Sequence, residues 1–507
     1  MSDKYRRRFT GFIAFVLMVL LLAGCDKPLQ KAKYKAIKTV VGLAGADLSP
    51  NPALLASFDP ERDEKAKEEL GYTIGTQAYL YGVAGLRLEN FRYGMSRLFK
   101  LAGTINPDRV SDVGEDGMTY NEYAYLKKLP NANMRFGASP NHDTLYGGIF
   151  FKLDKEPLVI TVPEIKDRYS NLQITNAFFS NDGYINAKGT CSPCLYLLAG
   201  PDWKGSVPDA MTVVRTNTNE GYLAIRILID GPEEYARVNE IQSRFDARPL
   251  ANYLNPENKI SLEPFLEPDD SGDLSVYRRI VEIALRNPTL KEMDNAAWSS
   301  FQYIGMFPDR PFDPEQIDPA IKRGMKRAID TVHDIVAWKV KSRGYKSKTN
   351  WRVDLLGGDY GQNYLRRTES VVQGLFLHDP KEALYFLSYH DEKGELLTGE
   401  NKYRLHFNAD QLPPVHEFWS ITLYDKSYNI VENPIQRFAI GDRTKGLHYN
   451  EDGSLTIYLQ SDKADAGASN WLPTPAGDNF RLTFRMYKPK DVMFDPKTLE
   501  HYLPPIT

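Results

Sequence analysis

The chain has 507 residues, of which 42% are hydrophobic and 25% are charged, and these ordinary proportions exclude a disordered, collagen-like or coiled-coil protein. The formal net charge of −3 excludes a basic nucleic-acid-binding protein, so no nucleic-acid partner is expected. The 30 Tyr and 24 Phe residues favour a β-rich fold, because aromatic side chains suit pleated, half-buried surfaces.

Residues 1–24 have the pattern of a secretory signal peptide. Basic residues within positions 4–8 precede an apolar run at 12–22, which is shorter than the ~20 residues that a membrane-spanning helix needs. The run ends in Leu-Ala-Gly-Cys25, which resembles the lipobox of bacterial lipoproteins, whose Cys is lipidated in the mature protein.

We therefore expect Cys25 to anchor the protein in a lipid bilayer, on the periplasmic side of a bacterial membrane. Asp26 resembles the signal for retention in the inner membrane of enteric bacteria. An uncleaved anchor with an incidental Cys is the alternative. Residues 25–60 show no clear periodicity and are expected to form a tether.

The next two segments differ in their hydrophobic periodicity. Residues 61–133 are expected to be mainly helical, because Leu70, Ile74 and Tyr81 recur at helical spacing. Residues 134–250 are expected to form a first β-sandwich, since apolar and polar side chains alternate at 158–162 and 170–175. The polar side of the second alternating run faces solvent by default, or else lines a cavity between two sheets; it consists of Asn171, Gln173 and Thr175.

Cys191 and Cys194 form a Cys-Ser-Pro-Cys motif. Two Cys this close usually pair in an exported protein, so a turn disulfide is the favoured interpretation. Redox catalysis is the less favoured alternative, because the motif leads into a predicted strand rather than a helix. A zinc site is less favoured still, since two Cys supply only half of its ligands.

The C-terminal half repeats the change from helix to strand. Residues 251–389 are expected to form a helical connector, with an apolar stripe along 320–340 that is typical of core packing. Residues 390–507 are expected to form a second β-sandwich, since alternation returns at 455–460 and 481–487. The predicted fold class is therefore mixed and β-rich, with two β-sandwich domains and helical segments packed between and before them.

The sequence contains none of the common catalytic or cofactor motifs. There is no G-x-S-x-G elbow, no G-x-G-x-x-G, no P-loop, no H-E-x-x-H and no EF-hand loop. We therefore expect no nucleotide cofactor, and a divalent metal is left open.

A first polar stretch follows a Pro-Asn turn at residues 140–146. Asp143 is expected to pair with Arg168, and such a pair either orients a substrate carboxylate or holds a general base. A structural ion pair with an Asx-turn at Asn141 is the competing interpretation. His142 is of the type that titrates near neutral pH, although a lone His in such a place is more often a surface loop residue.

A second polar stretch runs through residues 412–437 and 470–473. Alternation places Trp419 on one strand face and Ser420 on the other. Arg437 and Arg485 are candidates to pair a buried carboxylate or the anionic group of a ligand, because an Arg within a strand usually needs such a partner. Trp471 is expected to pack in the core.

Both stretches resemble known bacterial families. Asn-x-Asp-Thr-x-Tyr at 141–146, Val-Pro at 162–163 and Asp-Arg-Tyr at 167–169 resemble the domain of unknown function 1254. Leu-Pro-Pro at 412–414, Phe-Trp-Ser at 418–420 and Asn-Trp-Leu-Pro at 470–473 resemble its companion, the domain of unknown function 1214. The resemblance covers about residues 75–250 and 390–507 and implies two jelly-roll-like β domains in an exported protein, with no established activity.

Two functions follow as hypotheses. The first is a cofactor-independent hydrolase, lyase or isomerase that acts on a small polar or sugar-like substrate in a β-sandwich cleft. Asp143 would be the general base or a metal ligand, Arg168 would orient it, and Tyr146 and Tyr169 would support the substrate. The further candidate residues are His142, Asn141, Asn171, Gln173, Trp419, Arg437 and Arg485. The alternative is a non-catalytic lipoprotein that binds a ligand or scaffolds partners in the cell envelope, and a homo-oligomer is left open.

Overall fold

The computed structural model describes residues 59–113, 117–135, 139–185, 194–258, 263–288, 292–463 and 468–507. The predicted signal peptide, Cys25, Asp26 and almost all of the tether lie outside the described residues, as does Cys191, so these predictions stay predictions. By their internal contacts residues 64–507 form one unit, distinct from residues 1–63.

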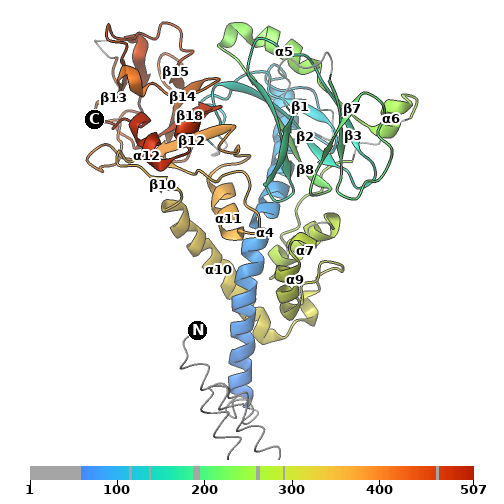
Figure 1. Cartoon of the computed structure of the whole chain (residues 1–507). Helices are drawn as coiled ribbons and strands as arrows, with labels where there is room; N and C mark the ends of the chain where they lie inside the picture. The colour runs from blue at the N-terminus through green and yellow to red at the C-terminus, as the bar shows by residue number, and fades with distance from the viewer. Residues whose placement is uncertain are drawn as a thin grey trace, which may run out of the picture. The chain divides into compact units, whose positions relative to one another are not determined.

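The first sandwich consists of a five-stranded and a four-stranded sheet (Figure 1). The five-stranded sheet has the order β1 (Tyr123–Tyr125), β2 (Thr144–Lys152), β8 (Glu220–Leu228), β4 (Ser170–Asn176), β5 (Asn181–Ile185). The four-stranded sheet has the order β7 (Met211–Arg215), β6 (Cys194–Ala199), β3 (Leu158–Val162), β9 (Asp246–Pro249). Alternation places Leu172 and Ile174 of β4 in the core between the sheets, as predicted.

The second sandwich has the same construction. Its six-stranded sheet has the order β10 (Tyr345–Lys346), β11 (Arg352–Val353), β12 (Ala383–Ser388), β18 (Phe480–Tyr487), β14 (Trp419–Asp425), β15 (Ala439–Gly441). Its three-stranded sheet has the order β13 (Tyr403–Phe407), β16 (Leu455–Gln460), β17 (Trp471–Pro473). Trp419, Ile421 and Leu423 of β14 point into the core between these sheets.

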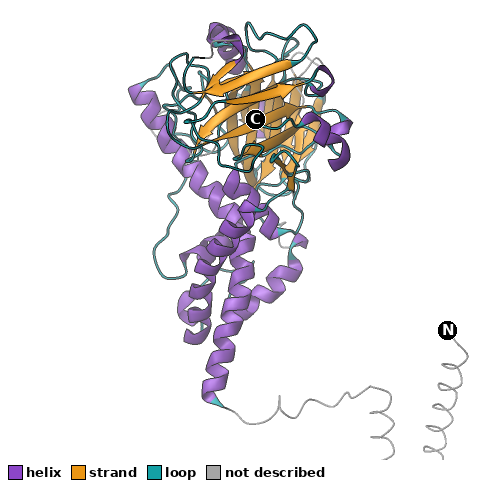
Figure 2. Cartoon of the chain, turned by 90° about the vertical axis from the view of Figure 1, so that its left-hand side faces the viewer, coloured by secondary structure: helices purple, strands orange, loops and turns teal. Residues whose placement is uncertain are grey.

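Helices form the third part of the fold, and Figures 1 and 2 show them below the strands. They are α4 (Pro60–Ile105), α7 (Ser275–Arg286), α9 (Asn295–Phe301), α10 (Pro319–Lys341) and α11 (Tyr364–Gln373). Three further helices, α5 (Tyr235–Ser243), α6 (Leu250–Leu254) and α12 (Pro496–Leu499), lie on the sandwiches. The helix α10 approaches α4 closely, because a Cβ at Gly324 would lie 2.0 Å from the carbonyl oxygen of Glu68. In the part of the chain that the structure describes, no helix is both long and apolar enough to cross a membrane.

The fold is mixed and β-rich, as the sequence predicted, but two boundaries differ. The strand β1 lies within residues 61–133, which were predicted to be mainly helical. The strands β10, β11 and β12 lie within residues 251–389, which were predicted to be a helical connector, and they belong to the second sandwich. These strands have only two to six residues, which is too few for a clear local periodicity, and β12 is completed by β18, about 100 residues further along the chain.

Candidate functional site

A cavity of about 410 Å³ lies between the two sandwiches and the C-terminal ends of α10 and α11. Its size falls within the range of small-molecule sites, roughly 300–1,000 Å³. The first sandwich contributes Asn141 from the loop before β2, Tyr146 from β2 and Arg226 from β8. The cavity is therefore built from segments that are far apart in the sequence.

One face of the six-stranded sheet forms a wall of the cavity, because side chains along β12 and β18 point alternately to the cavity and to the core. Along β18, the residues that line the cavity are Arg481, Thr483, Arg485 and Tyr487, while Leu482, Phe484 and Met486 lie in the core. The neighbouring β12 contributes Tyr385 opposite Arg485, and Leu387 opposite Thr483. One strand face therefore carries two arginines with a threonine between them.

Three arginines of this cavity are almost completely buried: Arg226 is 7%, Arg481 4% and Arg485 3% exposed. Arg226 donates to Gln173 Oε1 at 2.7 Å and to the carbonyl oxygen of Phe376 at 2.9 Å. Among the described residues, no carboxylate lies within ion-pair distance of any of the three guanidinium groups. Buried charges are normally paired, whereas here one carboxylate, that of Asp143, acts on Arg485 from beyond ion-pair distance.

Among the residues that the structure describes, the two arginines of β18 contact only neutral oxygens and aromatic rings. Arg485 donates to Thr422 Oγ1 at 2.9 Å, to the carbonyl oxygen of Ser139 at 3.0 Å and to Tyr424 Oη at 2.7 Å. Arg481 donates to Ser139 Oγ and lies 4.2 Å from the ring centroid of Tyr428. Burial, and to a lesser degree the positive charge of Arg485, lowers the pKa of Arg481.

Several polar atoms at the cavity have no partner among the described residues. The hydroxyl of Thr483, the Nε of Arg481 and both ring nitrogens of His378 are buried without a hydrogen bond. Burial, with a smaller effect of Arg226, lowers the pKa of His378 well below its ordinary value, so its ring is neutral. Unsatisfied buried groups are rare in native proteins, and their concentration here marks a place where a ligand would complete the hydrogen bonding.

Each of the two sandwiches matches the model of a known protein family. Residues 120–249 match the model of the protein family of unknown function DUF1254, and residues 382–491 match that of DUF1214. The chain pairs a DUF1254 domain with a DUF1214 domain. Arg226 belongs to the DUF1254 domain, whereas Arg481 and Arg485 belong to the DUF1214 domain.

A solved structure shares this fold. The VPA0106 protein from Vibrio parahaemolyticus is 22% identical, with a TM-score of 0.62 over 86% of this chain and 99% of that chain. A putative uncharacterized protein from Burkholderia cenocepacia is 12% identical over 84% of this chain and 94% of that chain, with a TM-score of 0.36. None of the curated proteins matches the chain.

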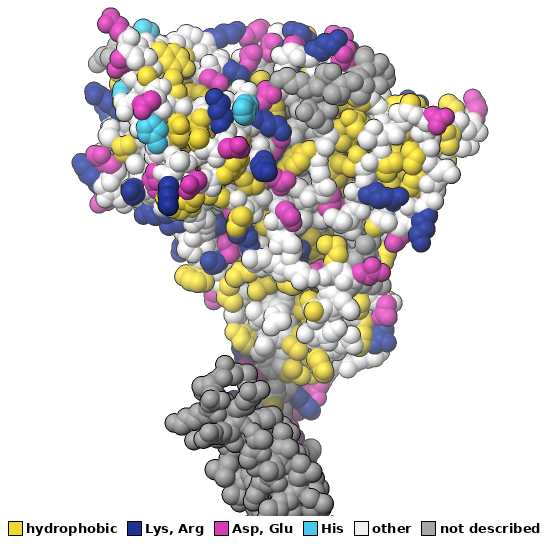
Figure 3. Space-filling view, in the orientation of Figure 1, with side chains coloured by type: hydrophobic (Ala, Val, Ile, Leu, Met, Phe, Trp, Pro, Cys, Tyr) yellow, Lys and Arg dark blue, Asp and Glu magenta, His cyan; other side chains and the backbone are white. Residues whose placement is uncertain are grey.

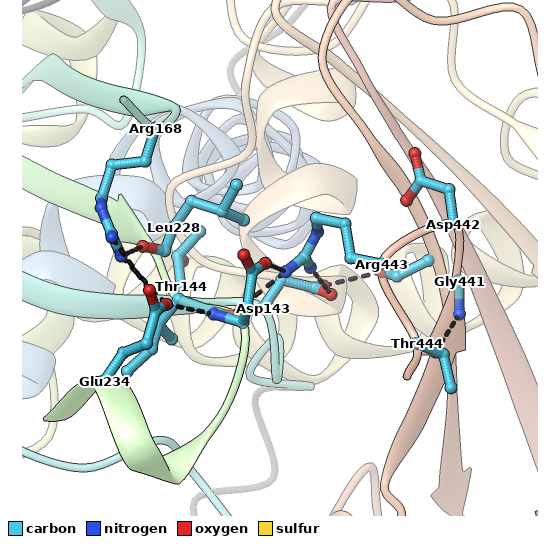
Figure 4. A network of polar contacts seen from close by, with 12 residues as sticks. Asp143, Thr144, Arg168, Leu228, Glu234, Gly441, Asp442, Arg443 and Thr444 are labelled. Atoms are coloured by element: carbon cyan, nitrogen blue, oxygen red, sulfur yellow. Dashed lines mark hydrogen bonds and ion pairs between the residues drawn. The ribbon is translucent and has the colours of Figure 1, made fainter. Parts of the chain in front are cut away.

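Asp143 does not line the cavity but joins the two domains (Figure 4). Its carboxylate accepts from Arg443 at 2.9 Å and from Ser420 Oγ at 2.7 Å, and both partners lie in the DUF1214 domain. The predicted pair of Asp143 with Arg168 is wrong. Arg168 instead donates to Glu234 at 3.1 Å and to Asp167, within the DUF1254 domain.

Three of the predicted site residues line the cavity: Asn141, Tyr146 and Arg485. Burial raises the pKa of Tyr146 to about 12, so its phenol is neutral at physiological pH and can donate a hydrogen bond. The Oη of Tyr146 accepts from the backbone N–H of Asn141 at 2.8 Å, which fixes the loop before β2 against the sheet.

The polar face of β4 is buried and serves the structure of the domain interface. Asn171 donates to Glu382 Oε1 at 2.7 Å, and Tyr169 donates to the same oxygen at 2.6 Å. Gln173 holds the guanidinium of Arg226. These residues support the cavity from behind and do not line it.

The remaining predicted residues lie away from the cavity. Trp419 packs in the core of the DUF1214 domain, with its ring centroid 5.8 Å from that of Phe407, so its predicted contact with substrate is wrong. Arg437 donates to the carbonyl oxygens of Ser469 and Trp471 at 2.8 and 2.9 Å. His142 is half-buried, its Nδ1 lies 2.6 Å from the carbonyl oxygen of Pro130, and burial lowers its pKa.

Sequence reasoning missed Arg226, Arg481, Thr483 and His378 as site residues. The alternating Arg-x-Thr-x-Arg of residues 481–485 was a usable signal, because it places two arginines on one face of a strand. No local signal marks His378, which follows α11 in an irregular segment.

Two other predictions concern cysteine and metal. Cys194, at the start of β6, is disulfide-bonded, while Cys191 lies outside the described residues, so their pairing stays a prediction. Where the chain is described, no group of three or more His, Cys, Asp or Glu side chains is arranged to hold a metal ion.

Proposed function

We propose that the protein binds a small organic anion in the cavity between the DUF1254 and DUF1214 domains. The observation that carries this proposal is the set of three buried arginines, Arg226, Arg481 and Arg485, with no carboxylate partner among the described residues. A carboxylate or phosphate group would accept hydrogen bonds from the planar guanidinium groups and neutralise their charge.

The charge of the cavity lining supports an anion over a neutral ligand. Asp354 is the one acidic side chain among the described residues that line the cavity. Its carboxylate is already occupied, because it accepts from Arg343 Nε at 3.0 Å and from Arg366. The lining therefore offers cationic and neutral donors with no free acidic group to compete with an anionic ligand.

Binding is better supported than the Asp143-dependent hydrolase, lyase or isomerase expected from the sequence. Asp143 is 3% exposed, lies outside the cavity lining and is held by Arg443 and Ser420. An isomerase or lyase that acts on the bound anion is the second candidate, and the neutral ring of His378 favours it because a general base needs a free nitrogen. Prolonged incubation with each anion that binds, followed by mass spectrometry of the small molecules, distinguishes the two functions.

The lipid anchor is a separate proposal supported by the sequence pattern that ends at Cys25. Lipidation of Cys25 would attach the protein to a bacterial membrane on its periplasmic side. Cys25→Ser should move the protein from the membrane fraction to the soluble fraction after cell lysis, and unchanged fractionation would contradict the anchor.

Titration calorimetry with hexanoate, benzoate, adipate and glycerol phosphate tests anion binding. At least one of these probes should bind with one site per chain, and Arg485→Gln should weaken that binding about tenfold or more, because hydrogen bonds to charged groups are strong. Arg485→Lys keeps the charge and provides a second variant if the glutamine variant does not fold.

Arg168→Gln is the matched control, because Arg168 is also a buried arginine but lies outside the cavity lining. This variant should leave anion binding unchanged. Failure of all four probes, or equal losses in the Arg485 and Arg168 variants, would contradict the proposed function.

A further inference from the structure

A row of three residues crosses the cavity wall from its edge to the arginine pair. Arg352 on β11 lies opposite Leu387 on β12, and Leu387 lies opposite Thr483 on β18. Directly opposed residues of antiparallel strands share a sheet face, and all three residues line the cavity. The order across the sheet is therefore a cation, an apolar side chain and the Arg-Thr-Arg face of β18.

The spacing of strands gives this row a length. Adjacent strands lie roughly 4.8 Å apart, so Arg352 and Thr483, two strands apart, are separated by roughly 10 Å at the backbone. The side chain between them is that of Leu387, and other apolar lining residues come from the helical side of the cavity: Val340, Leu375 and Leu377. The middle of the cavity wall is thus apolar, while both sides of it carry guanidinium groups.

Arg352 is a further cationic group of the cavity without a partner among the described residues. Among the residues that the structure describes, none forms a hydrogen bond or ion pair with its guanidinium group. Arg352 is half-buried and Lys341 beside the same cavity is exposed, so this side is the more accessible one. Figure 3 shows further Lys and Arg side chains along the lower edge of the second sandwich, in the region of β10.

We infer that the ligand is an elongated dianion with an apolar spacer, of the α,ω-dicarboxylate class, and this inference rests on the proposed anion site. One carboxylate binds to Arg226, Arg481 and Arg485, where Thr483 supplies a further hydroxyl. The spacer lies along Leu387, and the second carboxylate binds to Arg352. A monoanion of the same length would leave Arg352 without a partner.

Calorimetric titration of the full chain with two matched series tests the inference. The dicarboxylates succinate, adipate and suberate are compared with butanoate, hexanoate and octanoate. One dicarboxylate should bind about tenfold or more tightly than the monocarboxylate of equal length, as a second charge-assisted contact implies. Arg352→Gln should abolish this gain, so that the variant binds the dicarboxylate no more tightly than the monocarboxylate of equal length.

Lys346→Gln is the matched control. Lys346 on β10 lies directly opposite Arg352 on β11 and does not line the cavity. Its substitution therefore removes the same charge one strand further from the cavity. The Lys346→Gln variant should still bind the dicarboxylate more tightly than the monocarboxylate of equal length. An equal loss in both variants would show a general electrostatic effect and would overturn the inference.

The two levels of the proposal fail in different ways. If monocarboxylates bind but the second carboxylate adds no affinity, the dianion inference is wrong and the anion site stands. If neither series binds, and glycerol phosphate does not bind either, the proposed function itself is wrong.

Discussion

Arg443 of the DUF1214 domain donates to Asp143 of the DUF1254 domain at 2.9 Å, across 300 residues of sequence. The Asp143 side chain is 4% exposed, and Arg443 also binds Asp230 at 2.7 Å. This contact is part of the interface that holds the walls of the cavity together. It explains why Asp143 lies in a conspicuous motif without lining the cavity.

Asp143→Asn should therefore change stability more than ligand binding. The amide removes the charge that pairs with Arg443 and should lower the free energy of unfolding by about 1–3 kcal/mol. Urea denaturation measures this loss, and calorimetry with the best-binding carboxylate should show an affinity within about twofold of the original. Unchanged stability with abolished binding would instead place Asp143 in the binding site.

Thr483→Val should have opposite effects on stability and on binding. The Thr483 hydroxyl is buried without a hydrogen-bond partner among the described residues, so the nearly isosteric valine should raise the free energy of unfolding by about 1 kcal/mol. The same change removes a hydroxyl that would donate a hydrogen bond to the ligand, and it should therefore weaken carboxylate binding. A variant that loses stability and keeps its affinity would show that this hydroxyl has a structural role.

Asp182 should make stability depend on pH near neutrality. Burial is the main cause that raises the pKa of its carboxyl from 3.8 to about 6, while hydrogen bonds from Asn217 act in the opposite direction. Because the folded state binds this proton more tightly than the unfolded state, the stabilisation is fully present below pH 4 and is lost as the pH rises through 6.

The measurement is urea denaturation at pH 5 and pH 7 for the original chain and Asp182→Asn. The original chain should lose up to about 1.4 kcal/mol per pH unit from this one group, and the variant should lack that part of the slope. Equal slopes in the two proteins would contradict the raised pKa.

Gly324→Ala should destabilise the packing of the helices. The added Cβ would lie 2.0 Å from the carbonyl oxygen of Glu68, a contact that only a shift of α10 away from α4 could relieve. Overpacking of this kind costs about 1–3 kcal/mol, which thermal or urea denaturation would detect. Gly103→Ala is the control because no atom lies within 4 Å of its added Cβ, and equal effects of the two changes would contradict the close approach.

Alternation in sequence predicted the faces of long strands correctly. It placed Trp419 and Ser420 on opposite faces of β14, and the structure puts Trp419 in the core and Ser420 at the domain interface. The reason is physical, since the side-chain period of a strand is two and one face of this sheet is buried. Arg485 was a candidate for another reason, namely that an Arg within a strand usually needs an anionic partner, and Arg485 lines the cavity.

Partners that are distant in sequence could not be predicted in the same way. Arg168 was expected to bind Asp143, but Arg168 binds Glu234 and Asp143 binds Arg443. Which of many arginines meets a given carboxylate depends on how the domains dock, and no local pattern contains that information. The same applies to His378, whose place at the cavity results from the packing of three separate segments.

The most direct test of the anion site is a crystal structure of the protein with 6-bromohexanoate, whose bromine can be located by anomalous scattering. We predict a bromine peak inside the cavity and the carboxylate within hydrogen-bond distance of Arg481 and Arg485. A ligand bound only at the protein surface, with water in the cavity beside these arginines, would contradict the proposal.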